Sequence, residues 1–259
     1  MDLGLEGKTA IVCASSRGLG KACASALARE GVRIVVNGTD KARTEQTAAE
    51  IGTFAAERPL AVAADITTPE GRHALLAACP KPDILVNNAG GPPMGNFRQW
   101  TRSDWIKALD LNLLGAVEMI RAILDGMVER RFGRIVNITS VAVKAPIPDL
   151  DLSNASRSAL TGFVGGLARQ VSRYNVTMNN ILPGSFDTDR LASAASRQAS
   201  ANAVALEDQL RAMGEREVSG RFGSPEELGS LCAFLCASGS GYLTRQNILI
   251  DGGTYPGIV

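Results

Sequence analysis

The chain has 259 residues, of which 45% are hydrophobic, and this length suits one α/β domain, because such folds often run to about 250 residues undivided. Its net charge of +1, with no basic stripe, gives no reason to expect nucleic acid or a membrane surface as a partner. No apolar run reaches the roughly 18 residues of a membrane span, and segment 1–8 lacks the features of a signal peptide.

The cysteines and the single histidine argue against a metal centre. Five cysteines are present, and none forms a Cys-x-x-Cys pair. A metal site would need more ligands than His73 can add. We therefore expect buried free thiols, no metal and a reduced, cytoplasmic setting.

Short β-branched runs alternate along the chain with alanine-rich helical stretches. The predicted strands are Thr9–Cys13, Arg33–Asn37, Leu60–Ala64, Ile84–Asn87, Arg134–Thr139, Thr177–Leu182 and Asn247–Ile250. The predicted helices are Leu19–Glu30, Thr44–Phe54, Pro69–Ala78, Ser103–Val128, Ser153–Arg173 and Pro225–Ala237. Apolar strands separated by helices predict a doubly wound, mostly parallel seven-stranded sheet (a Rossmann fold) in a single domain over residues 1–259.

Segment 185–220 differs from the rest of the chain, because it is rich in alanine, serine and charge and has few large apolar residues. One interpretation is a pair of helices packed loosely over a substrate pocket as a lid. The alternative is an exposed, partly mobile insertion.

The turn after the first predicted strand is a candidate phosphate site. Ala14-Ser15-Ser16-Arg17-Gly18-Leu19-Gly20 leads from strand to helix, where small residues let the backbone approach a pyrophosphate and helix amides face its charge. Two glycines at such a turn often serve close packing alone. The position in the first strand–helix unit favours cofactor binding.

Several separate motifs together resemble those of short-chain dehydrogenases/reductases, and in particular 3-oxoacyl-(acyl-carrier-protein) reductases. They are Gly18-Leu19-Gly20, Asn87-Asn88-Ala89-Gly90, Pro183-Gly184 with Thr188, and Gly241-Tyr242-Leu243-Thr244 followed by Ile250-Asp251-Gly252-Gly253. The resemblance spans almost the whole chain. Ala14 stands where the family has the first glycine of its loop, and Cys13 stands where it has threonine.

The resemblance implies a nicotinamide cofactor. The implied cofactor-binding residues are Ala14, Ser16, Arg17, Gly18, Leu19, Gly20, Asn37, Asp65, Asn88, Ala89, Gly90, Arg157, Pro183, Gly184 and Thr188. Asn37-Gly38-Thr39-Asp40 puts no acid directly after the second strand, and Arg17 resembles the basic residue that NADP-preferring members aim at the 2′-phosphate. We therefore expect NADP(H) rather than NAD(H). Asp40 argues mildly the other way unless it caps the next helix, and capping is equally open for Asp65.

The implied catalytic set is Ser140, Asn112, Ser153 and Arg157, and it departs from the family at two positions. Ser140 and Asn112 match the family's serine and asparagine. Ser153 and Arg157 stand where the Tyr-x-Ala-Ser-Lys pattern has tyrosine and lysine, and Ala155-Ser156 fix that register.

The two replacements weaken the expected proton transfer. An adjacent cation can bring a tyrosine of pKa about 10 toward neutrality, but an aliphatic hydroxyl is far less acidic, and arginine keeps its charge without deprotonating. Positioned acid–base groups contribute typically about 10²–10⁴-fold to rate, so a slow reductase is physically possible. Water or a nearby acid among Asp149, Asp151 and Asp187 could supply the proton; each of these acids also suits a loop or capping role.

Three functions remain open from the sequence. The first is an NADP(H)-dependent reductase of a small-molecule carbonyl, such as a 3-oxoacyl compound or another ketone, or a dehydrogenase of the corresponding alcohol. The second is a nucleotide-binding protein without dehydrogenase activity, and the third is a lyase or isomerase on the same scaffold. The resemblance also implies a homo-oligomer, either a dimer or a tetramer.

Overall fold

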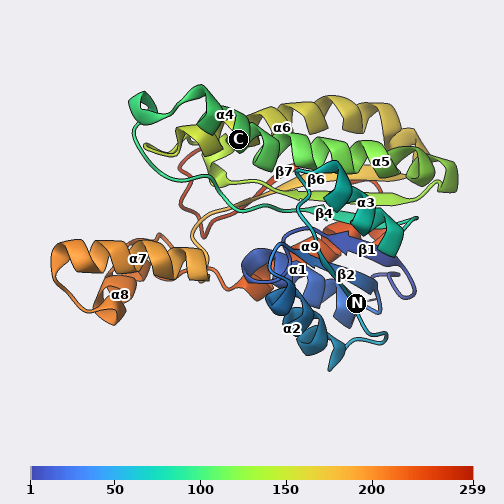
Figure 1. The fold of residues 1–259 in the computed structure, drawn as a ribbon, viewed down its shortest axis with the longest axis horizontal. Helices are drawn as coiled ribbons and strands as arrows, with labels where there is room; N and C mark the ends of the chain where they lie inside the picture. The colour runs from blue at the N-terminus through green and yellow to red at the C-terminus, as the bar shows by residue number, and fades with distance from the viewer. Residues whose placement is uncertain (1, 259) are drawn as a thin grey trace.

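The computed structural model describes residues 2–258, which form one α/β domain around a central sheet (Figure 1). The sheet has seven parallel strands, as predicted, and their order is β3-β2-β1-β4-β5-β6-β7. The strands are β1 (Thr9–Val12), β2 (Arg33–Gly38), β3 (Leu60–Ala63), β4 (Ile84–Asn87), β5 (Gly133–Ile138), β6 (Val176–Pro183) and β7 (Asn247–Ile250). The strand order changes direction between β1 and β4, because β2 and β3 lie on one side of β1 and β4 to β7 lie on the other. In such sheets ligands bind at this point, beyond the carboxyl ends of the strands.

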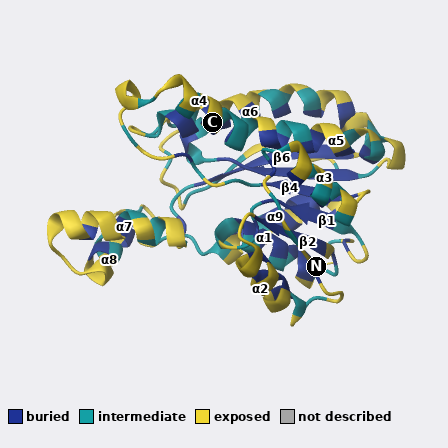
Figure 2. Cartoon of the chain, in the orientation of Figure 1, coloured by how far each residue is buried: buried dark blue, intermediate teal, exposed yellow. Residues whose placement is uncertain are grey.

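Helices cover both faces of the sheet. They are α1 (Gly18–Arg29), α2 (Lys41–Gly52), α3 (Pro69–Ala78), α4 (Arg102–Leu109), α5 (Gly115–Arg130), α6 (Asp151–Val171), α7 (Asp189–Asn202), α8 (Leu206–Arg216) and α9 (Pro225–Cys236). One core cluster joins the sheet to α1, α2 and α9, and the other joins it to α3, α5 and α6. Figure 2 shows the strands buried between these two layers.

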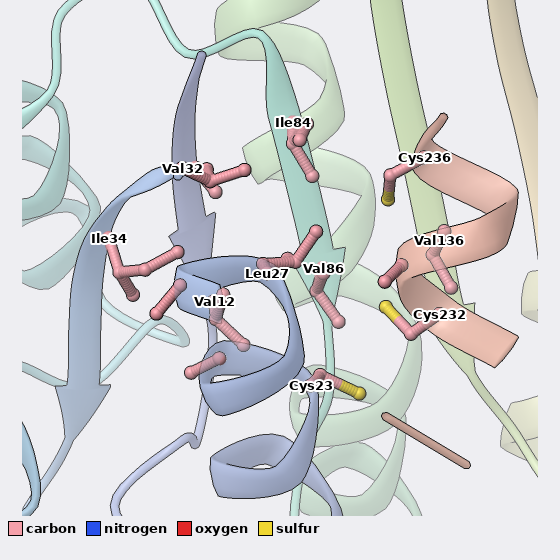
Figure 3. Packing of buried hydrophobic residues seen from close by; sticks show 14 of the residues in the cluster. Val12, Cys23, Leu27, Val32, Ile34, Ile84, Val86, Val136, Cys232 and Cys236 are labelled. Atoms are coloured by element: carbon pink, nitrogen blue, oxygen red, sulfur yellow. The ribbon is translucent and has the colours of Figure 1, made fainter. Parts of the chain in front are cut away.

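The first core cluster brings three thiols together (Figure 3). Cys23 on α1 and Cys232 and Cys236 on α9 lie among aliphatic side chains such as Leu27 and Val136. All five cysteines are free and buried, which confirms the prediction of unpaired thiols. Burial raises the pKa of the Cys13 thiol to about 12, so it is unreactive as a nucleophile.

The helix predicted over Ser103–Val128 is interrupted. Between α4 and α5 the chain forms one π-helical turn, Asp110–Leu114, which contains Asn112. The sequence pattern missed this turn because a single extra residue per turn barely disturbs helical periodicity. Two other helices begin earlier than predicted, α2 at Lys41 and α6 at Asp151.

Helices α7 and α8 project from the body as a helical arm, and much of their surface is exposed (Figures 1 and 2). Only the start of α7 adjoins the sheet, through the segment that follows β6. Within residues 2–258, no helix combines the length and the apolar character that crossing a bilayer requires.

A ladder of asparagine side chains ties four strands together. Nδ2 of Asn87 donates to Oδ1 of Asn137 at 2.9 Å, Nδ2 of Asn137 donates to Oδ1 of Asn180 at 3.0 Å, and Nδ2 of Asn180 donates to Oδ1 of Asn247 at 2.8 Å. The four residues are register partners across β4, β5, β6 and β7. The ladder therefore sets the relative heights of the strand ends from which the site loops begin.

Candidate active site

The loop after β1 is built for close approach by a ligand. Gly18 has φ +54°, a left-handed backbone that glycine adopts without cost. Gly20 admits no side chain, because a Cβ there would overlap the backbone carbonyl of Ala14 and lie 2.7 Å from Nδ2 of Asn88. Ala14 itself has φ +45°, so the residue that replaces the expected glycine keeps a glycine-like conformation at a cost in strain.

The start of α1 is open to an anion. Arg17, its N-cap, makes no side-chain capping bond, and the first turn carries no acid. The amides of Gly18 and Leu19 therefore keep their donors for a ligand, and the helix dipole favours negative charge there. This arrangement fits the pyrophosphate of a dinucleotide.

Two asparagines hold this loop from opposite sides. Asn37 Oδ1 accepts from the Ala14 amide at 3.1 Å, while its Nδ2 donates to the carbonyls of Val62 and Ala64. Asn88 Nδ2 donates to the Ala14 carbonyl at 3.1 Å. Asn37 is buried and its side chain is committed inside the protein, so it shapes the loop from beneath.

The charged residues near the adenosine end have defined local partners. Arg17 is exposed and pairs with Asp189 at the start of α7, with 3.6 Å between Nη1 and Oδ2. Asp40 is the N-cap of α2 and accepts from the Arg43 amide at 3.1 Å. Asp65 accepts from the amide and the hydroxyl of Thr67 at the turn before α3. The capping role is therefore observed for Asp40, whereas Thr68 caps the helix after Asp65.

The segment after β6 lies next to the cofactor loop. A Cβ on Gly184 would lie 2.8 Å from that of Asp251, so only glycine fits there. Thr188, the N-cap of α7, lies beside Gly18, since its Cγ2 is 3.7 Å from where a Cβ on Gly18 would stand. The structure thus brings together the expected cofactor residues of the loops after β1 and β6.

Arg157 occupies the centre of the expected catalytic set. Its residue exposure is 8%, and its Nε donates to Ser153 Oγ at 3.1 Å. Its Nη1 donates to the carbonyls of Ile138 and Thr139, both at 2.9 Å, and its Nη2 reaches the carbonyl of Ala89 at 3.5 Å. The guanidinium therefore joins α6 to the ends of β4 and β5.

Ser140 directly follows Thr139, whose carbonyl accepts a hydrogen bond from Arg157. Ser140 is the N-cap of a short 3-10 turn, and its Oγ accepts from the Ala142 amide at 3.1 Å. No acceptor within residues 2–258 takes the proton of Ser140 or that of Ser153, so both hydroxyls can donate to a ligand.

A second positive charge, that of Arg190, acts on the buried guanidinium of Arg157. Burial, reinforced by the charge of Arg190, lowers the pKa of Arg157 to about 10. Arg190, in the first turn of α7, lays its guanidinium on Gly91, where even a methyl group would overlap Nη1. Partial loss of water in that contact, with the charge of Arg197, lowers the pKa of Arg190.

Comparisons with known proteins agree with this geometry. The family model for short chain dehydrogenase matches residues 8–199. The chain belongs to the short-chain dehydrogenase family. The chain is 31% identical over 258 residues to the 3-oxoacyl-(acyl-carrier-protein) reductase FabG of Vibrio cholerae, covering 98% of this chain and 99% of that one.

Solved structures resemble this short-chain dehydrogenase along its whole length. An L-sorbose reductase from Gluconobacter frateurii, complexed with NADPH and L-sorbose, superposes with a TM-score of 0.94 at 30% identity, and each chain is covered in full. An actinorhodin polyketide ketoreductase with NADPH gives a TM-score of 0.89 at 27% identity, covering 95% of this chain and 97% of the other.

Asn112 is the least satisfied residue of the predicted catalytic set. It is buried in the π-helical turn, and neither Oδ1 nor Nδ2 has a hydrogen-bond partner in the described structure. Buried amides without partners are rare, and π-helical turns often mark functional sites. The turn packs against α6, the helix that carries Ser153 and Arg157.

The structure also shows which site features the sequence reasoning missed. Arg190 was not expected at the site, although its position two residues after Thr188 was a signal, because the start of α7 had to lie near the cofactor loop. No carboxylate of Asp149, Asp151 or Asp187 forms a hydrogen bond or an ion pair within the described residues, whereas the main-chain carbonyl of Asp149 accepts from the Gly95 amide.

Proposed function

We propose that the protein is an NADP(H)-dependent reductase of a small-molecule carbonyl compound, with Ser153 and Arg157 serving where its relatives are expected to use tyrosine and lysine. One observation carries this assignment. Arg157 bonds both to the Ser153 hydroxyl and to the peptide carbonyl directly before Ser140. The hydroxyls of Ser140 and Ser153, both free to donate, are thereby held near the buried cation of Arg157. Hydrogen-bond donors and a positive charge stabilise the negative charge that develops on a carbonyl oxygen as it becomes an alkoxide.

The chemistry divides between the cofactor and the chain. The bound nicotinamide supplies the hydride. Ser140 and Ser153 donate hydrogen bonds to the carbonyl oxygen, and Arg157 holds a positive charge beside Ser153 as negative charge develops. Ser153 then passes its proton to the alkoxide oxygen and regains one from water. A serine hydroxyl and an alcohol product are similarly weak acids, so the free-energy change of this proton transfer is close to zero. We expect the transfer to be slower than transfer from a tyrosine of lowered pKa.

The choice of NADP(H) rests on charge. Arg17 is exposed at the rim of the cofactor loop, and Asn37 to Thr39 place no acid directly after β2. Asp40, the first acid after that strand, is engaged as a helix cap. A 2′-phosphate would meet the guanidinium of Arg17 in competition with the exposed carboxylate of Asp189, and no acid at the end of β2 opposes it.

Assembly, location and the role of the arm belong to the same proposal. We propose a cytoplasmic homo-oligomer, a dimer or a tetramer, in which segment 185–220 forms a lid over the substrate. Support for association comes from exposed apolar side chains on α9 and near β7, namely Phe234, Tyr242 and Leu243. Light scattering on the purified protein measures the assembly directly.

The first experiment is a fluorescence titration of the purified protein with NADPH and with NADH. We expect micromolar binding that is tighter for NADPH, and Arg17→Gln should remove most of that preference. Arg43→Gln is the matched control, because Arg43 is an exposed arginine on α2 whose side chain forms no ion pair or hydrogen bond within residues 2–258.

Turnover is then tested by hydride transfer from deuterated NADPH to carbonyl substrates. Deuterium on the carbinol carbon of a product would support the reductase. Tight cofactor binding without transfer to any substrate would instead favour the alternative, a nucleotide-binding member of the family without dehydrogenase activity. Loss of cofactor binding altogether would contradict both.

A further inference from the structure

The reactive end of the site carries positive charge that the protein does not neutralise. Arg157 and Arg190 come from different helices, α6 and α7, and the charge of Arg190 helps to lower the pKa of the buried Arg157. Arg190 lies on Gly91, and Arg157 contacts the carbonyl of Ala89 two residues earlier in the same loop. Within the described residues, neither forms an ion pair with a carboxylate. Asp189, the acid next to Arg190 in sequence, pairs with Arg17 on the cofactor loop instead.

A second buried arginine shows how this protein satisfies such a group when no ligand is involved. Arg134 has 0% exposure and lies at the amino ends of β5 and β6. All three of its side-chain nitrogens donate to acceptors there, including the Ala237 and Asn175 carbonyls. It also stacks on the ring of Phe132, 4.4 Å from the ring centroid. Arg134 therefore has a full set of neutral hydrogen-bond partners, although Lys8 lies on the same Phe132 ring.

Arg157 is less completely satisfied. Nη2 has only the 3.5 Å contact with Ala89, although that nitrogen carries two hydrogens. A buried charge without a counter-charge is costly, and a second cation beside it adds to the cost. Arg190 reaches this place because Gly91 has no side chain to exclude its guanidinium.

We infer that Arg157 and Arg190 together bind an anionic group of the substrate, a carboxylate carried close to the reacting carbonyl, so that the substrate is an oxo acid rather than a neutral ketone. This inference rests on the proposed reductase function. The location favours the substrate over the cofactor phosphates as the source of the anion. Arg157 contacts the peptide before Ser140, at the reacting end, whereas the phosphate loop lies at Gly18 and α1. Arg190 lies between the two, because Thr188 and Asp189 adjoin the phosphate loop while its own guanidinium reaches Gly91. An arginine pair suits the planar, two-oxygen geometry of a carboxylate.

The test compares matched acids and esters. Acetoacetate and methyl acetoacetate, and pyruvate and methyl pyruvate, are assayed by NADPH oxidation with wild type and Arg190→Gln. We expect kcat/KM for each acid to exceed that of its ester, and Arg190→Gln to lower it for the acids by about 10- to 100-fold, as one charged hydrogen-bonding pair provides. The esters should change little. Arg121→Gln, on α5 and paired with Glu118, is the control that should change neither.

A binding measurement keeps the anion site testable even if no substrate is found. Malonate is titrated by calorimetry into the complex with NADP⁺. Binding that Arg190→Gln weakens at least tenfold, with the NADP⁺ affinity unchanged, supports the anion site even where all four carbonyl compounds fail to react. Such a result would separate a failure of the reductase proposal from a failure of this one.

Three results would overturn the inference. Esters that react as well as their acids, with no effect of Arg190→Gln, would leave the reductase standing and remove the anion site. A loss of NADPH affinity in Arg190→Gln that lowers acids and esters alike would assign Arg190 to the cofactor phosphates. Failure of malonate to bind wild type, together with failure of both acids to react, would show that the arginine pair recruits no carboxylate.

Discussion

Nε of Arg157 donates to Oγ of Ser153 at 3.1 Å across one turn of α6. This bond fixes which role the serine can take, because the arginine uses an acceptor lone pair of Oγ and leaves the hydroxyl proton for a ligand. The planar guanidinium orients the serine hydroxyl through this bond as well as placing a charge beside it. The pair therefore holds a hydrogen-bond donor in place with its proton directed to a ligand.

The pH dependence of turnover should reflect this difference. Burial lowers the pKa of Arg157 to about 10, so the guanidinium stays charged up to about pH 9 and is half charged near pH 10. We expect kcat to be flat from pH 6 to 9 and to fall as pH approaches 10, measured by NADPH oxidation at saturating substrate. A bell-shaped profile with a midpoint between pH 6 and 9 would mean that another group supplies the proton.

At alkaline pH the titration of Arg157 should affect the free energy of unfolding in the direction opposite to its effect on kcat. Because the folded pKa of Arg157 lies below the unfolded value, the folded state binds fewer protons between about pH 10 and the higher unfolded pKa, and this site's contribution to stability rises with pH in that window. Below about pH 9 both states are charged at this residue, so it adds no pH dependence there. A fall in kcat near pH 10 thus reports the site rather than loss of its fold, and circular dichroism at the same pH separates the two.

Restoring the family's pair should raise activity. The double variant Ser153→Tyr with Arg157→Lys introduces a phenol whose pKa an adjacent ammonium can lower, so we expect kcat to rise by about 10²- to 10⁴-fold and to acquire a titration near neutral pH. Arg157→Lys alone should fall well short, because it leaves no phenol to give the proton. Ser153→Tyr alone, beside the charge of Arg157, should recover only part of the gain, because the phenol must share the space that the guanidinium occupies. An unchanged rate in the well-folded double variant would show that proton transfer does not limit turnover.

The strained alanine of the cofactor loop offers a gain in stability. Ala14 has φ +45°, which costs an L-residue about 1–2 kcal/mol, and part of that gain is offset by the greater unfolded-state freedom of glycine. Ala14→Gly should therefore raise the free energy of unfolding by about 0.5–1 kcal/mol in urea titrations. Ala26→Gly, in the interior of α1, is the control and should lower it by about 1 kcal/mol. Equal losses in both variants would refute strain at Ala14.

Substituting a middle residue of the asparagine ladder should lower the free energy of unfolding more than substituting an end residue. Asn137→Ala removes two rungs at once and leaves the buried amides of Asn87 and Asn180 without those partners, so we expect a loss of about 2–4 kcal/mol in the free energy of unfolding. Asn247→Ala removes one rung at the exposed edge and should lose less than half as much. Similar losses in the two variants would argue that the rungs contribute little individually.

Much of the fold could be predicted because its signals are local. Apolar strands such as Ile84–Asn87 alternate with helices, which is enough for a parallel doubly wound sheet, and the glycine loop follows directly from β1. Ser153 and Arg157 could be predicted to share a face, because four residues make about one helical turn. These features depend on neighbours in sequence, so the sequence pattern is sufficient.

The remaining features depend on contacts between distant segments. Asn37 is a predicted cofactor residue, but its side chain bonds to Ala14, Val62 and Ala64. The pairing of β2 with β1 brings Ala14 near it, and the pairing of β2 with β3 brings the other two. Arg190 lies against Gly91 because of the direction in which α7 leaves the sheet. Neither relation has a periodic or spacing signal, so sequence reasoning could not find them.

The asparagine ladder also has a polarity. Every rung donates in the same direction, from β4 toward β7, which leaves Oδ1 of Asn87 as an acceptor without a partner at one end. Reversing one amide would place two donors or two acceptors face to face, so all four must turn together or not at all. The amide orientation of Asn247 at the exposed edge of the sheet is thus coupled, through Asn180 and Asn137, to that of the buried Asn87 at the end of β4.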